Sequence, residues 1–397
     1  MAFEKLSDYY GSQSILPTFS RFNDVAALQR HEQHRHDLFT RKLNVPVRLF
    51  HNARLIEFGP DTGENSLVFA GWGADCTLVE PNIKAHPAIQ QYFQTFGLGD
   101  RLSRLDSHDI LDFSQTRNPN EKFDFIDAEG FLFTVKPEQA WIDLFAKMLN
   151  PGGLVVLFDY EAYSTFFEFL LKVIHSHLRR VMGLNAVDSA RALFSAKWDS
   201  IPHRRPMEAW VMDVLENPFV RLRYLLDASQ LARKMAASGL DLYSSWPPYK
   251  DALDVYWFKK TQATEDQLQH MADFVTRSRL SHMFGRKHFV AQLHSDLETT
   301  LRELLTLMDG LIDKVESEAI DRCLEIFRFI VQLIESPAVI SDEEDLTLSL
   351  AAIRSVEEVL NIISTQDANR LIAFCNNDQA FIRTWGAPSH FAVYQLR

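Results

Sequence analysis

One stretch constrains the fold more than any other: residues 55–82, LIEFGPDTGENSLVFAGWGADCTLVEPN. It starts with a short apolar run that stops at Gly59, which is typical of a buried parallel strand. A helix is then expected over residues 64–72 and a second strand over 74–79. This order of strand, glycine turn, helix and strand predicts an α/β unit with a parallel sheet.

The turn after the first strand is rich in glycine. Residues 59–63, G-P-D-T-G, let the backbone approach a ligand without interference from Cβ atoms, and the amides of the following helix face the turn. Glu80 ends the second strand, 17 residues after Gly63. A carboxylate there can accept hydrogen bonds from both hydroxyls of a ribose. The spacing therefore favours a site for a ribose-containing ligand.

The same turn differs from the fingerprint of dinucleotide-binding domains. G-x-G-x-x-G needs a second glycine where this chain has Asp61. Asp61 and Glu64 place two carboxylates beside the turn, and these repel a phosphate but tolerate a cation. We therefore expect a ligand without phosphate groups. The alternative is an α/β domain with an ordinary glycine turn and no ligand.

The motif E-F-G-P-D-T-G followed by L-V-E-P-N resembles the first two motifs of the class I S-adenosylmethionine-dependent methyltransferases. The ligand of that family carries a sulfonium and an ammonium group and no phosphate. L-N-P-G-G-L-V-V-L at 149–157 is similar to the family's third motif. The resemblance implies a seven-stranded, mostly parallel, doubly wound (Rossmann-like) sheet, with S-adenosyl-L-methionine as cofactor.

The resemblance also implies where the cofactor binds. The family has an acid after the third strand that bonds the adenine, and Asp109 followed by Ile110 matches it best, with Asp106 as the alternative. The loop after the fourth strand, A-E-G-F, brings Glu129 and Phe131 toward the methionine part and the transferred methyl group. The residues assigned to the cofactor are Glu57, Gly59, Pro60, Gly63, Glu80, Pro81, Asp109, Ile110 and Glu129.

The chain has 397 residues, which is longer than a usual single core, so more than one domain is expected. We expect a helical N-terminal extension over residues 1–45 and the methyltransferase domain over 46–260. A helical cap insertion is expected within it at about 160–235. Residues 261–397 show helical spacing of apolar positions and predict an all-helical C-terminal domain.

Residues 240–260 read as two β-like runs separated by a Pro-Pro turn. They are expected to supply the antiparallel sixth and seventh strands of the sheet. Trp246 and Tyr249 flank the turn, where aromatic side chains are candidates for a wall against a sugar or another acceptor. Packing of these rings at the sheet edge is the alternative.

Methyl transfer depends largely on holding two atoms in line at near-contact distance, with modest help from a base. The candidate bases are Glu129, Asp159, His175 and His203. Of these we assign Glu129, His175 and His203 to catalysis, although an acid such as Glu129 can equally cap a helix. His175 lies on the polar side of an amphipathic helix expected over 160–182, and His203 lies in the cap insertion.

The combination of E-F-G-P, V-E-P-N, A-E-G-F and W-P-P-Y is similar to bacterial methyltransferases associated with surface saccharides. It favours an O or N acceptor on a sugar or glycan. Two alternatives to this function stay open. In the first, the chain is a protein methyltransferase that docks its target through the C-terminal helices. In the second, it is a non-catalytic cofactor-binding interaction protein.

Composition narrows the class of partner. The net charge of -12 argues against general nucleic-acid binding. Three widely spaced cysteines, an N-terminus without an apolar segment and the lack of a long apolar stretch predict a cytoplasmic protein with no transmembrane segment. The C-terminal helices offer a possible homo-oligomer interface.

The helix expected over residues 23–43 carries three histidines, His31, His34 and His36. Three histidines can form a metal cluster. We expect no metal, because no cysteine or second histidine pair supports one. Arg30, Arg35 and Arg41 on the same helix instead indicate a solvated, charged face.

Overall fold

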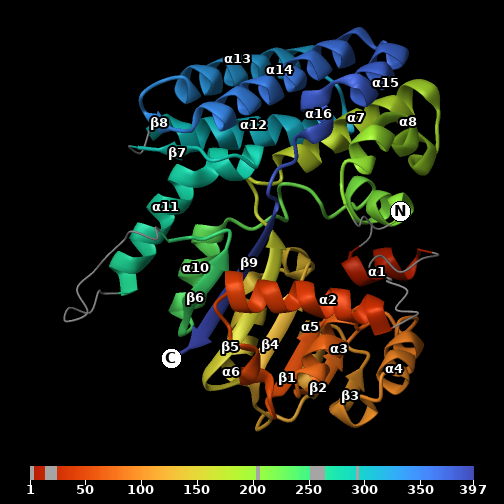
Figure 1. The fold of residues 1–397 in the computed structure, drawn as a ribbon, viewed down its shortest axis with the longest axis vertical. Coiled ribbons are helices and arrows are strands. Elements are labelled where there is room, and N and C mark those ends of the chain that lie inside the picture. Colours follow the sequence, from red (N-terminus) through yellow and green to blue (C-terminus); the bar gives the residue numbers. More distant parts are fainter. Residues whose placement is uncertain (1–3, 14–24, 203–205, 251–263, 292–294) are drawn as a thin grey trace. The chain divides into compact units, whose positions relative to one another are not determined.

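The computed structural model describes residues 4–13, 25–202, 206–250, 264–291 and 295–397. Within this part the chain forms two compact units (Figure 1). The first unit consists of Met1–Asp159, Ala228–Leu268 and His390–Arg397, and the second of Tyr160–Asp227 and Gln269–Ser389. The C-terminal end of the chain therefore belongs to the same unit as the glycine turn.

A seven-stranded sheet forms the centre of the first unit, in the order β3-β2-β1-β4-β5-β9-β6. Its strands are β1 (Arg54–Phe58), β2 (Asp75–Val79), β3 (Leu102–Asp106), β4 (Phe123–Glu129), β5 (Leu149–Tyr160), β6 (Leu240–Trp246) and β9 (Ser389–Leu396). Strands β3, β2, β1, β4 and β5 pair in parallel, and β6 pairs with β9 in antiparallel fashion. This confirms the predicted mostly parallel α/β sheet.

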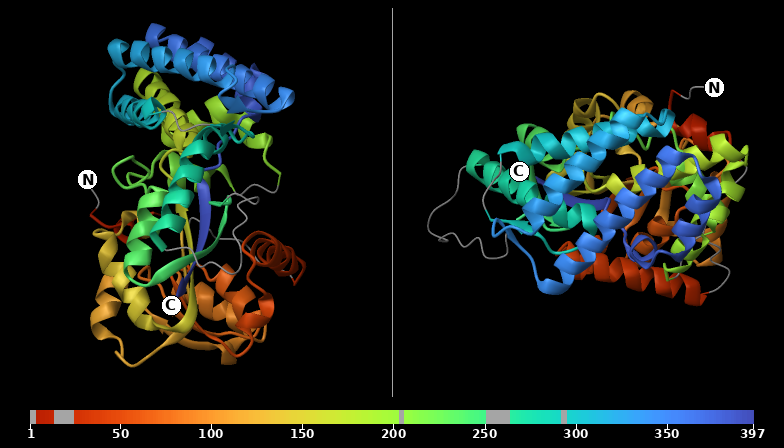
Figure 2. Two further views of the ribbon diagram at one scale, coloured as in Figure 1. Left: turned by 90° about the vertical axis from the view of Figure 1, so that its left-hand side faces the viewer. Right: turned by 90° about the horizontal axis from the view of Figure 1, so that it is seen from above.

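Helices cover both faces of this sheet, as the views in Figure 2 show. The helical elements of the first unit are α1 (Leu6–Gly11), α2 (Val25–Asp37), η1 (Leu38–Lys42), η2 (Val47–Phe50), α3 (Glu64–Gly71), α4 (His86–Thr95), η3 (Gly99–Arg101), α5 (Ile110–Thr116), η4 (Leu132–Thr134), α6 (Glu138–Met148) and α10 (Ala228–Ala237). One face packs against η1, η2, α3 and α4 through a single apolar cluster. On the other face, the ring of Phe58 contacts Phe113 of α5 and Phe145 of α6. Burial on both faces agrees with the sequence of β1, in which Leu55, Ile56 and Phe58 are apolar and every residue after Arg54 is buried.

Aromatic rings fill the first of these faces close to the N-terminal segment. The ring of Phe50 stacks on Phe125 of β4, with 4.3 Å between the centroids, and on Phe69 of α3 at 5.3 Å. Phe39 of η1 meets both Phe50 and Phe69 edge to face. The N-terminal extension is thus anchored to the sheet by buried aromatic contacts.

The seventh strand comes from a different part of the chain than we expected. The run expected over about 250–260 lies almost wholly in residues 251–263, outside the described residues. Between β5 and β6 the structure instead places β9, which pairs with β6 from Leu240 opposite Leu396 to Trp246 opposite Phe391. The buried Val393 of β9 belongs to the apolar cluster of the first unit. The prediction for this strand is therefore corrected: the strand that pairs with β6 is β9, which lies at the C-terminal end of the sequence.

The second unit is mainly helical. Its elements are α7 (Phe166–Met182), α8 (Ala186–Asp199), α9 (Met207–Trp210), η5 (Val211–Leu215), α12 (Ser295–Asp313), α13 (Ser317–Ile334), α14 (Glu343–Thr365), α15 (Ala368–Asn377), α16 (Gln379–Arg383) and a pair of short strands, β7 (Phe289–Val290) and β8 (Val339–Ile340). Helix α11 (Thr264–Phe284) starts in the first unit and continues in the second. The expected cap insertion and the expected C-terminal helices thus both contribute to this unit.

Helix α7 is buried along most of its length, which differs from the polar side that we expected. Lys172 is 3% exposed, and its Nζ donates to the carbonyl oxygens of Val214 (3.1 Å) and Asn217 (2.7 Å). A lysine stem that ends on backbone carbonyls satisfies its ammonium group without reaching solvent. The polar residues of α7 that recur at helical spacing therefore make hydrogen bonds inside the protein and do not form a solvated face.

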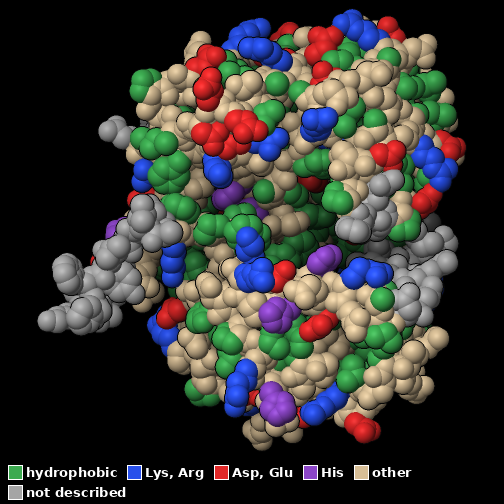
Figure 3. Space-filling view, in the orientation of Figure 1, with side chains coloured by type: hydrophobic (Ala, Val, Ile, Leu, Met, Phe, Trp, Pro, Cys, Tyr) green, Lys and Arg blue, Asp and Glu red, His purple; other side chains and the backbone are tan. Residues whose placement is uncertain are grey.

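Lys and Arg side chains are interspersed with Asp and Glu over the face of the molecule shown in Figure 3. Among the described residues, none of the helices combines the length and apolar character that crossing a bilayer requires.

Candidate functional site

The glycine turn adopts the backbone conformation that its sequence suggests. Gly59 and Gly63 have φ of +65° and +83°, and Asp61 between them has φ of +48°. All three lie in the left-handed region, which glycine adopts without strain and aspartate tolerates. The N–H of Gly59 donates to the carbonyl oxygen of Val79 at 2.9 Å, so the turn leaves the sheet at the carboxyl ends of β1 and β2.

Glu80 joins this turn directly. The Asp61 N–H donates to Glu80 Oε2 at 2.9 Å, and the Asn82 N–H donates to Glu80 Oε1 at 2.7 Å. Glu80 is 6% exposed, and burial raises its pKa to about 8 although these two backbone donors oppose the shift. The acid at the end of β2 and the turn after β1 therefore converge, as the spacing predicted.

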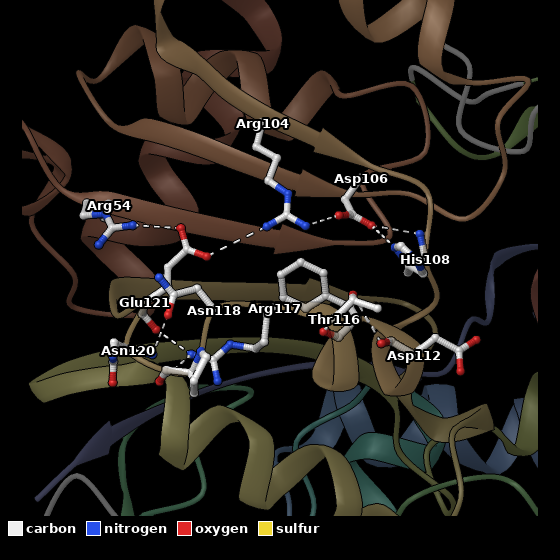
Figure 4. Close-up of polar contacts among 12 residues, drawn as sticks. Arg54, Arg104, Asp106, His108, Asp112, Thr116, Arg117, Asn118, Asn120 and Glu121 are labelled. Atoms are coloured by element: carbon white, nitrogen blue, oxygen red, sulfur yellow. Dashed lines mark hydrogen bonds and ion pairs between the residues drawn. The ribbon is translucent and has the colours of Figure 1, made fainter.

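The two acids considered after β3 are both engaged by neighbours. Asp106 accepts from the backbone N–H (3.0 Å) and Nδ1 (2.6 Å) of His108 and pairs with Arg104, which also contacts Glu121 (Figure 4). Burial tends to raise the pKa of Asp106, but the hydrogen bonds from His108 and Arg104 outweigh it and lower the pKa. Both of its oxygens thus have partners within this network.

Asp109 caps helix α5. Its Oδ1 accepts from the N–H groups of Leu111 (3.0 Å) and Asp112 (2.9 Å), and its carboxylate pairs with Lys5. Ile110, beside it, is buried. Asp109 therefore serves as the cap of this helix, and its place as an adenine ligand stays a prediction.

Three carboxyl groups share one face of the sheet at its carboxyl edge. Glu57 of β1 is the register partner of Asp127 on β4, and Glu129 follows two residues later on the same face of β4. We call Glu57, Asp127 and Glu129 the carboxyl cluster. Glu57 and Asp127 are 3% and 1% exposed.

Arg35 of α2 is the cation that faces this cluster. It binds Glu129 through both guanidinium nitrogens, with Nη2 to Oε1 at 2.6 Å and Nη1 to Oε2 at 3.0 Å. The guanidinium also lies 5.0 Å from the ring centroid of Phe39 and 5.2 Å from that of Phe69. Asn65 of α3 adds a third donor to Glu129 at 3.2 Å. The carboxylate of Glu129 is therefore held rigidly between two helices.

The other two members of the cluster are less well compensated. The Ser66 hydroxyl donates to Glu57, and burial raises the Glu57 pKa to about 8 despite this bond. Among the described residues, no group donates a hydrogen bond to either oxygen of Asp127. Burial, followed by the charges of Glu129 and Glu57, raises the pKa of Asp127 well above its usual range. Protonation is the ordinary response of a buried acid that lacks a donor.

Arg35 and Asp127 were not among the residues predicted for the site. Arg35 was expected on a solvated face, whereas its side chain is 7% exposed. The available signal was the position of Arg35 four residues before the apolar Phe39 and seven after Leu28, on the apolar side of the helix. Asp127 gave the weaker signal of an acid between Ile126 and Ala128, in a strand that also contains Asp124 and Glu129.

The remaining cofactor candidates surround the turn. Pro60 and Gly63 are buried, and Pro81 is half-buried. A Cβ atom on Gly59 would lie only 3.0 Å from the ring of Phe131, so Phe131 from the loop after β4 covers this glycine. The ends of β1, β2 and β4 thus meet at one place, as expected for a ligand site in a parallel sheet.

The candidate bases fall in different units. Asp159 ends the first unit's β5 segment, is 7% exposed and accepts from the Phe133 N–H at 3.3 Å. Burial raises its pKa to about 8. His175 is fully buried in the second unit, with Nε2 bonded to the Ala186 carbonyl at 2.8 Å, and burial lowers its pKa. His203 lies outside the described residues.

The two aromatic substrate candidates differ in exposure. Trp246 is 40% exposed, and the Lys42 ammonium lies 3.9 Å from its ring centroid. Tyr249 is 4% exposed, and its hydroxyl contacts His390 Nδ1 at 2.9 Å. Trp246 therefore keeps a surface that a ligand can reach, whereas Tyr249 packs internally.

The strand order, the carboxyl-edge turn and the acid at the end of β2 define a Rossmann-like α/β domain with a ligand site of the type found at parallel sheet edges. A family model described as "Methyltransferase domain" matches residues 29–245, which is more than half of the chain. The chain belongs to this methyltransferase family. The match confirms the resemblance to S-adenosylmethionine-dependent methyltransferases.

Solved structures give a weaker likeness. An S-adenosylmethionine-dependent methyltransferase from Agrobacterium tumefaciens is 19% identical, with 34% of this chain and 44% of that chain covered and a TM-score of 0.26. The N-methyltransferase NodS from Bradyrhizobium japonicum, in complex with S-adenosyl-L-homocysteine, is 18% identical, with 39% and 72% covered and a TM-score of 0.28. The chain spans between 32% and 44% of the first three solved structures that it resembles. No curated protein matches it in sequence.

The pairing of Arg35 with Glu129 predicts a large stability effect. Arg35→Met leaves Glu129 buried without its counter-charge, and we expect the free energy of unfolding of the first unit to fall by about 3 kcal/mol. Replacing both partners, in Arg35→Met/Glu129→Gln, should cost less than Arg35→Met alone. Urea unfolding followed by circular dichroism measures both values.

The matched control is Arg41→Met on the adjoining turn. Arg41 is 73% exposed and pairs with Asp37 at 3.3 Å, so its loss should change stability by less than about 0.5 kcal/mol. Equal effects of Arg35→Met and Arg41→Met would contradict a buried, stabilising pair.

Proposed function

We propose that the chain is a methyltransferase that moves the methyl group of S-adenosylmethionine to an oxygen or nitrogen acceptor. The observation that carries the proposal is the convergence of Glu80 on the turn at Asp61, 2.9 Å apart. An acid on the strand next to a glycine turn suits a ribose that lies across the two strand ends. The family match supports the same ligand class.

The charge of the site agrees with a cationic donor. Asp61 is half-buried beside the turn, Glu64 is buried at the start of α3, and the carboxyl cluster lies on the neighbouring strands. S-adenosylmethionine supplies a sulfonium and an ammonium group. A site rich in carboxyl groups attracts such a ligand and disfavours a pyrophosphate.

Among the candidate bases, Asp159 has one oxygen, Oδ2, without a donor among the described residues, so this oxygen is free to bond an acceptor hydroxyl or amine. Burial raises its pKa to about 8, so Asp159 accepts a proton from the acceptor only in its ionised form. Glu129 is instead committed to Arg35 and Asn65, so it fits a fixed acceptor of hydrogen bonds. His175 and His203 rest on their positions in sequence alone.

A sugar or glycan-linked acceptor is the favoured substrate class. It is supported by the resemblance to methyltransferases associated with surface saccharides and by the partly exposed ring of Trp246, since an aromatic face offers apolar contact to a sugar.

The cofactor assignment predicts a strong effect of Glu80→Ala. Loss of a buried acceptor for a pair of hydroxyls should weaken S-adenosylmethionine binding by about 10-fold to 100-fold in calorimetry. Asp75→Ala is the matched control. Asp75 is the first residue of β2, at the amino end of the same strand, and it pairs with Arg101. Its affinity should stay within about twofold of the wild type. Unchanged affinity in Glu80→Ala would reject the assigned site.

Transfer itself is tested with tritiated S-adenosylmethionine and fractionated lysate. We expect label in a glycan-containing fraction when the intact chain is present and none with Glu80→Ala. Label in protein would overturn the acceptor class but keep the reaction. Cofactor binding without any transfer of label would overturn the proposed activity.

A further inference from the structure

The carboxyl cluster holds more acid than its surroundings neutralise. Glu57, Asp127 and Glu129 bring three carboxyl groups together, and Arg35 is the guanidinium that pairs with one of them. If all three were ionised, two negative charges would remain uncompensated in a buried place. Burial of net charge is costly, and proteins usually avoid it by keeping a proton.

Asp127 is the place for one such proton, because it is the member of the cluster without a donor. It is 1% exposed, and none of the described residues donates a hydrogen bond to it. Because Asp127 and Glu129 lie on the same face of β4, a protonated Asp127 can donate to Glu129. Glu57, whose pKa burial raises to about 8, holds a second proton near neutral pH, so the cluster then contains two neutral acids beside the ion pair of Glu129 with Arg35.

The groups that face this cluster come from each element packed against it. Helix α2 contributes Arg35 and His31, which bonds Asn65 at 3.0 Å; α3 contributes Glu64; and β2 contributes Cys76. Burial lowers the pKa of His31 and raises that of Cys76, so neither adds charge near neutral pH. Arg35 is therefore the cation that lies against the carboxyl cluster.

We propose that the carboxyl cluster releases a proton to solvent when the cationic methyl donor binds, and that the protein thereby distinguishes the donor from its uncharged thioether product. This inference depends on the proposed function. S-adenosylmethionine carries a net charge of plus one, and S-adenosylhomocysteine, of nearly the same shape, carries none. A positive charge near the cluster stabilises its ionised form, so the proton of Asp127 is lost to bulk solvent and no other bond changes.

The same linkage favours product release. After transfer the sulfonium charge is gone, and an ionised cluster loses the charge that stabilised it. Proton uptake then restores the neutral acid, and the product is held less tightly than the donor. In this device Arg35 is a positioning residue, because it fixes Glu129 and limits the negative charge that the donor has to compensate.

The sign of the pH dependence follows. Binding that releases a proton becomes stronger as pH rises through the range in which the cluster is protonated when free. The affinity for S-adenosylmethionine should therefore rise between pH 6 and pH 8 relative to that for S-adenosylhomocysteine. Any proton from Glu80 cancels in this ratio, because both ligands carry the same ribose.

Calorimetric titration of the full chain in phosphate and in Tris, which differ in ionisation enthalpy, measures the protons released. We expect the binding of S-adenosylmethionine to release up to about one proton more than the binding of S-adenosylhomocysteine. For each proton of difference, the ratio of the two affinities should change about tenfold per pH unit. Sinefungin, which carries an ammonium group in place of the sulfonium, should behave like the donor.

Asp127→Asn keeps the shape of the neutral acid and cannot lose a proton. It should abolish the excess proton release and make the affinity ratio independent of pH. Asp124→Asn is the matched control at the amino end of β4, where Asp124 accepts from the Arg54 N–H at 2.9 Å, and it should leave the linkage intact.

The wild-type comparison decides the matter even if Asp127→Asn does not fold. Equal proton release for the donor and S-adenosylhomocysteine would overturn the inference and leave the proposed function standing. Excess release that persists in a folded Asp127→Asn would assign the proton to another group and also overturn it. Lack of binding by all three ligands would overturn the proposed function itself.

Discussion

Burial of carboxyl groups at one edge of a parallel sheet is the constraint on which the rest of this structure depends. Strands β1, β2 and β4 end at the same edge, and each delivers an acid there or just before it: Glu57, Glu80 and Glu129. Every one of them needs donors, because an unpaired buried carboxylate is costly. The glycine turn donates to Glu80, α3 donates to Glu57 and Glu129, and α2 donates to Glu129. These hydrogen bonds fix the turn and the two helices in position.

The need of these buried acids for donors also explains the position of the N-terminal extension. Arg35 brings charge to Glu129, and the rings of Phe39 and Phe69 provide the apolar surface on which the guanidinium rests. The sequence predicted only that this extension is helical. Here its described contribution is a buried cation at the edge of the sheet, which shapes the electrostatic potential that a charged donor meets.

Much of the first unit was readable from sequence because its signals are local. The apolar run before Gly59, the spacing to Glu80 and the fourth strand before Glu129 each depend on a short segment, and the sheet has the predicted class. The partners of these residues were not readable. Arg35 and Glu129 are separated by 94 residues, and β9 reaches the sheet from the far end of the chain. Helical spacing alone likewise did not show that Lys172 and His175 are internal.

Protection of the backbone against hydrogen exchange tests the central claim most directly, since it needs neither an acceptor nor a substitution. With S-adenosylmethionine present, we expect slower exchange at residues 57–65, 80–82 and 127–131 and little change at the amino ends of β1, β2 and β4. Protection that falls elsewhere, or no protection at a saturating concentration of the donor, would contradict a site built from these strand ends.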